Sequence, residues 1–193
     1  STDIGSLFVK TKNKTFNKFL QSDKSNNDLL MKKILDFFGE NSLKIDDISK
    51  IFVNQGPGNF SGLRGSLAIA KGISLSKNLN LFGYDTFVWS CAKFFNKKNF
   101  IYVFLKIRNN YFGKKFDSKL KEVSKIEKIS KEEILEKYYN EFIVIPKIMV
   151  EIFDEKILSM KDINIVNLDH NLLESLKIES LLNKGLIKPL YLS

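Results

Sequence analysis

Short apolar runs alternate with amphipathic stretches along the whole chain. Runs of strand length that are bounded by polar or turn-forming residues predict β-strands. They lie at residues 5–10, 15–19, 51–53, 81–84, 100–107, 111–116, 142–145 and 163–168. Stretches with helical spacing and capping residues predict helices. They lie at residues 27–38, 61–77, 86–95, 130–139 and 171–183. Because strands alternate with helices, we predict a fold of the α/β class.

A polar stretch at residues 96–99 interrupts this pattern. We predict a boundary there between an N-terminal lobe, residues 1–97, and a C-terminal lobe, residues 98–193. The longest apolar run covers residues 100–105, which is far shorter than the roughly 18–20 residues of a membrane-spanning helix. We therefore predict no membrane association.

The formal net charge of +9 suggests a nucleic-acid function. However, only Arg64 and Arg108 of the 31 basic residues are arginine, the residue that pairs best with phosphates and guanines. The lysines are spread from Lys10 to Lys188. We interpret them as solvated surface residues, and a tRNA-binding module stays open as an alternative that rests on charge alone.

The single cysteine and the single histidine limit which disulfides and metal sites are possible. Cys91 is the only cysteine, so no internal disulfide can form, and we predict a cytoplasmic protein. His170 is the only histidine, which excludes a metal site built on paired histidines. We predict no catalytic residue and no metal ligand.

A glycine-rich segment, residues 54–72, follows one predicted strand and opens the next predicted helix. A P-loop requires Lys followed by Ser or Thr after its last glycine, and Leu63-Arg64 stands there instead. A dinucleotide-binding fingerprint requires Gly or Ala where Ser61 stands. We therefore do not expect a catalytic loop here.

The glycines instead fall on one face of the predicted helix, at steps of four and three residues. The positions on this face are Gly58, Gly62, Gly65, Ile69 and Gly72. Each glycine inside a helix costs about 0.5–1 kcal/mol relative to alanine. Such a flat face makes physical sense where another backbone approaches closely. That backbone belongs either to a helix of the same chain or to a helix of a partner protein.

This segment closely resembles the signature of the TsaB family. The family pattern reads Gly-Pro-Gly-Ser-Phe-Thr-Gly, then Leu or Val, then Arg, with Ala-Lys-Gly further on. The chain has Gly56-Pro57-Gly58-Asn59-Phe60-Ser61-Gly62-Leu63-Arg64 and then Ala70-Lys71-Gly72. It departs from the pattern at Asn59 and Ser61, and one residue fewer than usual separates Arg64 from the next small position.

The resemblance touches most of the chain. Residues 81–84 resemble the family's next strand, and residues 101–116 resemble its hairpin. The ending Pro189-Leu190-Tyr191-Leu192 resembles the family's close, with Ser193 in place of the usual arginine. The family opens with an apolar strand that ends in Asp-Thr-Ser or Asp-Thr-Thr, so the resemblance implies that this strand lies upstream of Ser1.

The resemblance implies a fold, a role and partners. The fold would be two ribonuclease-H-like lobes of the actin-like ATPase superfamily. The family supplies the non-catalytic scaffold subunit of the bacterial machinery that makes threonylcarbamoyladenosine in tRNA. It pairs through N-terminal-lobe helices with a catalytic, metal-dependent TsaD-like subunit, and an ATP-hydrolysing TsaE-like subunit joins the pair. ATP can bind near the subunit junction, and contact with tRNA is indirect.

Carried onto this chain, the pairing helices are residues 27–38 and 61–77. The residues expected at the partner-binding face are Leu30, Ile34, Phe37, Gly62, Gly65, Ile69 and Gly72. Arg64 is expected to pair with a carboxylate or a helix carbonyl near the contact, and a phosphate contact is the alternative for this residue. The same face could hold a homodimer when the chain is alone. An independent weak ATPase or peptidase of the same superfamily is the second alternative function.

Overall fold

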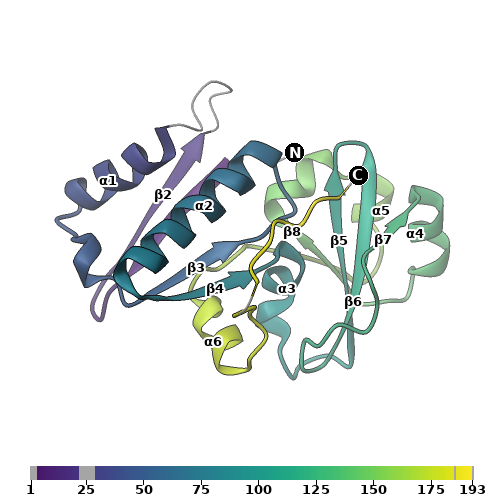
Figure 1. Cartoon of the computed structure of the whole chain (residues 1–193). Helices are drawn as coiled ribbons and strands as arrows, with labels where there is room; N and C mark the ends of the chain where they lie inside the picture. The colour runs from purple at the N-terminus through teal and green to yellow at the C-terminus, as the bar shows by residue number, and fades with distance from the viewer. Residues whose placement is uncertain (1–3, 22–28, 185, 193) are drawn as a thin grey trace. The chain divides into compact units, whose positions relative to one another are not determined.

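The computed structural model describes residues 4–21, 29–184 and 186–192 of the chain (Figure 1). The chain forms two compact units. The N-terminal unit consists of Thr2–Tyr84 together with Leu182–Tyr191, and the C-terminal unit consists of Asp85–Leu181. Residues 1–3 lie outside the described part, so the strand expected upstream of Ser1 stays a prediction.

The division between the units differs from the boundary predicted between residues 97 and 98. Residues 85–97 belong to the C-terminal unit, because helix α3 (Thr86–Cys91) packs on strands of the C-terminal sheet. The polar stretch at residues 96–99 marks an exposed turn inside that unit. The polar stretch therefore marks a surface segment, whereas the boundary between the two units is set by the packing of α3.

The N-terminal unit contains two strand pairs. β1 (Ile4–Lys10) and β2 (Thr15–Gln21) form an antiparallel hairpin. β3 (Lys50–Asn54) and β4 (Asn80–Tyr84) pair in parallel. The four predicted strands match these elements, with ends that differ by at most two residues.

Helix α2 (Phe60–Lys77) provides the crossover that a parallel strand pair requires, and it packs against β3 and β4 (Figure 1). Its buried side chains are spaced four and three residues apart, so they form one stripe: Leu63, Leu67 and Ala70. The core cluster of this unit consists of Val53, Leu67, Ala70 and Ile187. The other helical elements of the unit are α1 (Leu30–Glu40) and the short η2 (Ile45–Asp47).

The last described residues of the chain are built into the N-terminal unit. Gly83 and Asn183 exchange two backbone hydrogen bonds of 2.8 Å, in which each N–H donates to the other's carbonyl. The Leu190 N–H donates to the Gln55 carbonyl at 2.6 Å. The helix predicted over residues 171–183 is therefore too long, because α6 (Leu172–Ile178) ends and the chain turns toward β4 before residue 183.

The C-terminal unit is built on a five-stranded sheet with the order β7-β6-β5-β8-β9. Its strands are β5 (Phe100–Ile107), β6 (Asn110–Asp117), β7 (Glu127–Ile129), β8 (Ile143–Pro146) and β9 (Ile163–Val166). β5, β6 and β7 pair antiparallel, whereas β8 pairs in parallel with β5 and with β9. The predicted hairpin is confirmed, and Arg108 lies in its turn with a φ of 54°.

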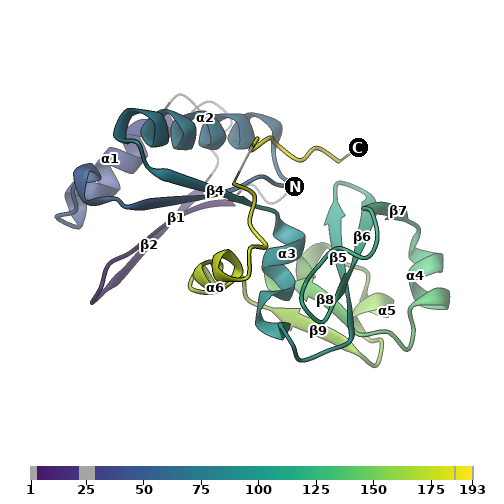
Figure 2. The ribbon, with the colours of Figure 1, turned by 60° about the horizontal axis from the view of Figure 1, so that its bottom comes forward.

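Short helices accompany this sheet (Figure 2). They are α3, η3 (Ala92–Phe94), α4 (Lys131–Lys137), η4 (Lys147–Ile152), α5 (Glu155–Leu158) and α6 (Leu172–Ile178). α4 begins at the predicted capping box, in which the side chains of Ser130 and Glu133 each accept from the other's backbone N–H. β7, η4 and α5 were not predicted, because each is too short to show a periodic pattern.

One lysine is buried in the C-terminal unit. The Lys114 side chain is 4% exposed, and its Nζ lies 3.3 Å from the Asp85 carboxylate and 2.6 Å from the Glu122 carboxylate. Asp85 also caps α3 by accepting from the Val88 N–H at 2.8 Å. Burial raises the pKa of Asp85, and Lys114 opposes that rise. A buried charge is tolerated only when it is paired, so these three side chains tie α3 to β6.

His170 packs against Trp89, with ring centroids 4.8 Å apart. The Trp89 indole N–H donates to the Asp169 carbonyl at 2.9 Å and thereby fixes the position of the ring. Burial lowers the pKa of His170 below its usual 6.5, although the nearby Asp169 carboxylate opposes this shift. The folded chain therefore favours the neutral imidazole.

Replacing Gly83 by alanine should destabilise the N-terminal unit. A Cβ atom at Gly83 would lie 2.4 Å from Gln55 Oε1 and 3.0 Å from Ile187 Cγ2. We expect the free energy of unfolding to fall by about 1–3 kcal/mol, because a well-packed core resists added volume. Urea denaturation followed by circular dichroism would measure it. Gly39→Ala is the control, since no atom lies within 4 Å of a Cβ there; equal stability of both variants would contradict the packing at Gly83.

Lowering the pH should reduce the free energy of unfolding of the chain through protonation of His170. A histidine whose pKa is lowered by folding binds its proton more readily when unfolded, so stability falls as the pH drops below 6.5 toward the folded pKa. Urea midpoints measured at about pH 7.5 and about pH 5 should differ less for His170→Gln than for the wild type, since glutamine does not titrate. The same pH dependence in both proteins would count against this assignment.

Candidate functional site

The Gly-Pro-Gly segment after β3 is held by the chain's own contacts. Gly56 has a φ of 115°, and a Cβ atom there would lie 2.8 Å from the Leu190 carbonyl oxygen. The buried Gln55 side chain donates through Nε2 to the Lys188 carbonyl at 2.7 Å and accepts from Asn183 Nδ2 at 2.6 Å. Glycine is required at this position by its φ and by the close backbone approach. The segment therefore anchors the C-terminal residues.

The start of α2 is capped from within the chain. Asn59 Oδ1 accepts from the Ser61 N–H at 3.0 Å and from the Gly62 N–H at 3.4 Å. Amide groups at this position are what a helix N-terminus offers to a phosphate. The Asn59 side chain already accepts from two of them.

α2 presents one face to solvent. Its members step by three or four residues, and they are Ser61, Arg64, Ala68, Gly72 and Leu75, here called the exposed α2 face. Leu75 exposes 83% of its surface. The face is therefore lined mainly by small side chains, with an arginine near one end and a leucine near the other. A second helix can approach such a surface closely.

The predicted glycine face is divided between α1 and solvent. A Cβ atom at Gly65 would lie 3.9 Å from Leu30 Cδ2, so α1 already covers this position. Among the described residues, nothing outside the helix's own backbone lies within 4 Å of a Cβ at Gly62 or Gly72. Gly72 is exposed, whereas Gly62 and Ile69 are half-buried. A helix of the same chain therefore contacts position 65 at an ordinary van der Waals distance, whereas no side chain of the described residues contacts position 72.

The three apolar residues expected on α1 differ in accessibility. Phe37 exposes only 2% of its surface, so it is a core residue and does not lie on the partner-binding surface where it was predicted. Leu30 and Ile34 are half-buried. The exposed leucines at this helix are instead Leu29 at 40% and Leu35 at 48%. Leu35 was not predicted as a contact residue, because it lies off the stripe of apolar positions on the helix. A leucine away from that stripe was the signal in the sequence that could have identified it.

Arg64 contacts a hydroxyl group and an aromatic ring. Its Nε donates to Tyr191 Oη at 3.0 Å, and its guanidinium carbon lies 3.9 Å from the Phe60 ring centroid. The rings of Phe60 and Tyr191 stack with centroids 5.1 Å apart and an interplanar angle of 28°. Within the described chain Arg64 therefore contacts Tyr191 and Phe60, and its expected pairing with a carboxylate or a helix carbonyl near the partner contact stays a prediction. Tyr191 was missed as a site residue because 127 positions separate it from Arg64.

Across residues 4–21, 29–184 and 186–192, no group of three or more His, Cys, Asp or Glu residues is arranged to hold a metal ion. None of the helices described there is long and apolar enough to cross a membrane. Cys91 is buried, and burial raises the pKa of its thiol well above the usual value. Its thiol is therefore a packing group of α3.

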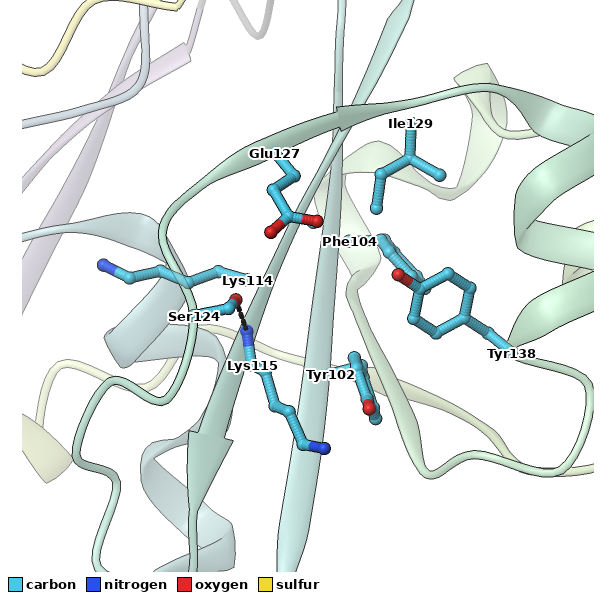
Figure 3. Close-up of a pocket in the computed structure, with 9 residues that line it drawn as sticks. Tyr102, Phe104, Lys114, Lys115, Ser124, Glu127, Ile129 and Tyr138 are labelled. Carbon is cyan, nitrogen blue, oxygen red and sulfur yellow. Dashed lines mark hydrogen bonds between the residues drawn. The ribbon is translucent and has the colours of Figure 1, made fainter.

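A small pocket of about 200 Å³ lies on the C-terminal sheet beside β7 (Figure 3). The rings of Tyr102, Phe104 and Tyr138 line it, and such ring faces attract cations. The chain supplies that cation itself, because Lys115 Nζ lies 4.9 Å from the Tyr102 ring centroid and 4.1 Å from that of Phe100. We therefore assign no ligand to this pocket.

Comparison with known proteins finds relatives for the region that contains the glycine-rich segment. Residues 21–100 match the family model described as TsaD, tRNA N6-adenosine threonylcarbamoyltransferase. The tRNA threonylcarbamoyladenosine biosynthesis protein TsaB of Buchnera aphidicola subsp. Baizongia pistaciae is 36% identical over 81 residues. The chain is therefore similar to TsaB over part of its length. The match covers 41% of the TsaB-like chain and only 36% of the length of that curated relative.

Solved structures show the fold. YeaZ from Pseudomonas aeruginosa has a TM-score of 0.67 with 11% identity, and the match covers 98% of this TsaB-like chain and 95% of YeaZ. A structure titled as an uncharacterized protein with similarity to peptidase YeaZ, from the same organism, has a TM-score of 0.70 with 10% identity and covers 99% and 95%. The predicted α/β fold, shared with these solved structures, is thereby confirmed.

Gly72→Ala should stabilise the isolated TsaB-like chain. No atom of the described chain would meet the added Cβ, and alanine is favoured inside a helix, so we expect the free energy of unfolding to rise by about 0.5–1 kcal/mol. Ala68→Gly, on the same exposed face, is the matched control and should lower it by a similar amount. Urea denaturation would measure both. A loss of stability in Gly72→Ala would mean that the fold itself requires this glycine.

Proposed function

We propose that this chain is a non-catalytic scaffold subunit in the biosynthesis of threonylcarbamoyladenosine in tRNA. In this role it pairs with a catalytic, TsaD-like threonylcarbamoyltransferase subunit. The support for the pathway is the homology to TsaB and the family match across residues 21–100. The family match covers α1 and α2, which are the helices proposed to make the contact.

The single observation that carries the pairing is Gly72 on the exposed α2 face. Glycine at this position costs the helix about 0.5–1 kcal/mol, and nothing among the described residues comes within 4 Å of a Cβ there. A close approach by another protein supplies a reason for the glycine that the chain itself does not supply. The exposed Leu75 on the same face offers apolar surface to that protein.

The proposed contact surface combines both helices. On α2 it consists of Gly62, Gly65, Ile69 and Gly72, and on α1 of Leu30 and Ile34, with Phe37 supporting α1 from beneath. Leu30 fills the space over Gly65, so the two helices present one continuous surface there. Helices with small residues at the contact pack at short interaxial distances.

The wider assembly is part of the same proposal. A TsaE-like, ATP-hydrolysing subunit joins the pair, ATP binds near the subunit junction, and tRNA is contacted indirectly. When the chain is alone, the same helix surface pairs two copies. The site of action is the cytoplasm.

An independent enzyme or a tRNA-binding module would behave differently in isolation. An independent weak ATPase or peptidase would turn over its substrate without a partner. A tRNA-binding module would bind tRNA alone, and that binding would weaken steeply with salt, because phosphate contacts release counterions. The scaffold would do neither until the catalytic subunit is added.

Gly72→Leu should abolish the complex with the catalytic subunit. Position 72 is exposed and a Cβ there would meet nothing in the described chain, so we expect a leucine to leave the fold unaffected while it blocks the close approach. The measurement is size-exclusion chromatography with light scattering on full-length protein, mixed with the TsaD-like subunit of the same organism. Wild type should give a heterodimer, and Gly72→Leu should give separate species.

The matched control is Glu136→Leu, an equally exposed change on α4 of the C-terminal unit. It should leave the heterodimer intact, and circular dichroism should show that both variants are folded. The proposal fails if wild type forms no complex. The proposed location of the contact fails if Gly72→Leu binds as well as Glu136→Leu.

A further inference from the structure

Phe60, Arg64 and Tyr191 form an exposed group on the N-terminal unit, here called the Arg64 cluster. Phe60 and Tyr191 expose 52% and 43% of their surfaces. The three residues come from the start of α2 and from the C-terminal segment, and the anchoring of that segment to Gln55 brings them together. Exposed aromatic rings around an arginine are the composition of energetic hot spots in protein interfaces.

The guanidinium of Arg64 is held in one orientation. Its Nε–H donates to Tyr191 Oη at 3.0 Å, and its guanidinium carbon lies over the Phe60 ring, 3.9 Å from the ring centroid. An arginine that is fixed in advance loses less side-chain entropy when it binds a ligand. The cluster is therefore organised before any partner arrives.

The N–H donors on the two Nη atoms of the same guanidinium are not used within the described chain. Arginine carries five N–H donors, and the bond to Tyr191 uses the one on Nε. Among the described residues, no other group accepts a hydrogen bond from Arg64 and no carboxylate forms an ion pair with it. The two Nη groups form a planar fork, which matches the two oxygens of a carboxylate.

The charge on α2 favours an acidic protein partner. The helix contains Arg64, Lys71 and Lys77 and no acidic residue, and only Lys77 has an ion-pair partner in the described chain, Asp46. A second copy that presented its own α2 would bring no carboxylate from that helix to Arg64. A phosphate would compete with Asn59, whose side chain already caps the helix start.

We infer that the Arg64 cluster is a preformed receptor for an Asp or Glu side chain of the protein that docks on the exposed α2 face. The carboxylate is bound by the Nη fork of Arg64, and the flanking rings of Phe60 and Tyr191 exclude water around it. This inference rests on the proposed function, because it names the recognition chemistry at the edge of the same contact. Arg64 is a specificity-determining residue here.

The test compares the affinities of full-length variants for the TsaD-like subunit of the same organism by isothermal titration calorimetry, with and without ATP. Arg64→Lys keeps the charge and loses the fork, so we expect Kd to rise about tenfold. Arg64→Gln also loses the charge, and we expect a rise of about a hundredfold with a weaker dependence of Kd on salt. Tyr191→Phe releases Nε, and we expect a rise of about three- to tenfold. Arg108→Lys, in the β5–β6 turn, is the matched control and should bind as wild type.

Each outcome decides a different point. If wild type forms a complex and Arg64→Lys and Arg64→Gln bind as tightly as Arg108→Lys, the receptor is refuted while the scaffold role stands. If the Arg64 variants differ from wild type only when ATP is present, the anion is a phosphate and the carboxylate assignment is wrong. If wild type forms no complex, both the scaffold role and this inference are overturned.

Discussion

The hydrogen bonds of Gln55 are the constraint on which the N-terminal unit depends. This buried residue bonds through its side chain and its backbone to the C-terminal segment, and its N–H also donates to the Tyr84 carbonyl at the end of β4 at 2.7 Å. A buried polar group that loses its hydrogen-bond partner costs about 1–3 kcal/mol of folding stability. Loss of the C-terminal segment would remove several of these partners at once. The absence of a Cβ at Gly83 gives the Gln55 side chain its room. Through this anchor, residues at the end of the chain come to lie beside the start of α2.

α2 serves the fold with one face and the proposed contact with another. The buried stripe holds the helix on β3 and β4, which leaves the opposite positions free to vary. There the chain carries small residues and glycine, although alanine would make a more stable helix. The helix is therefore less stable on its solvent-exposed face than it would be with alanine there. This loss of helix stability is expected in a subunit whose exposed face must let the backbone of another protein come close.

The sequence predicted the long periodic elements well and the short ones poorly. α2 shifted by one residue at its start, and the β5–β6 hairpin lies where alternating apolar runs placed it. By contrast, β7 and α5 have too few residues to show a period. At the candidate site, spacing identified the glycine face, but it could not tell that Leu30 covers Gly65 while Gly72 stays open. Nor could spacing reveal Tyr191 beside Arg64, since only the return of the C-terminal segment creates that contact.

That return also changes the connectivity of the molecule. The chain leaves the N-terminal unit after Tyr84 and re-enters it at Leu182, so two covalent links join the units. A protease that cuts one link leaves the other as a tether, and neither unit can diffuse away. The N-terminal unit is likewise discontinuous in sequence, so a fragment that ends at Tyr84 would lack Ile187 from its core and three of the groups that satisfy Gln55. The proposed partner-binding helices therefore depend on residues that the ribosome adds only after the whole C-terminal unit.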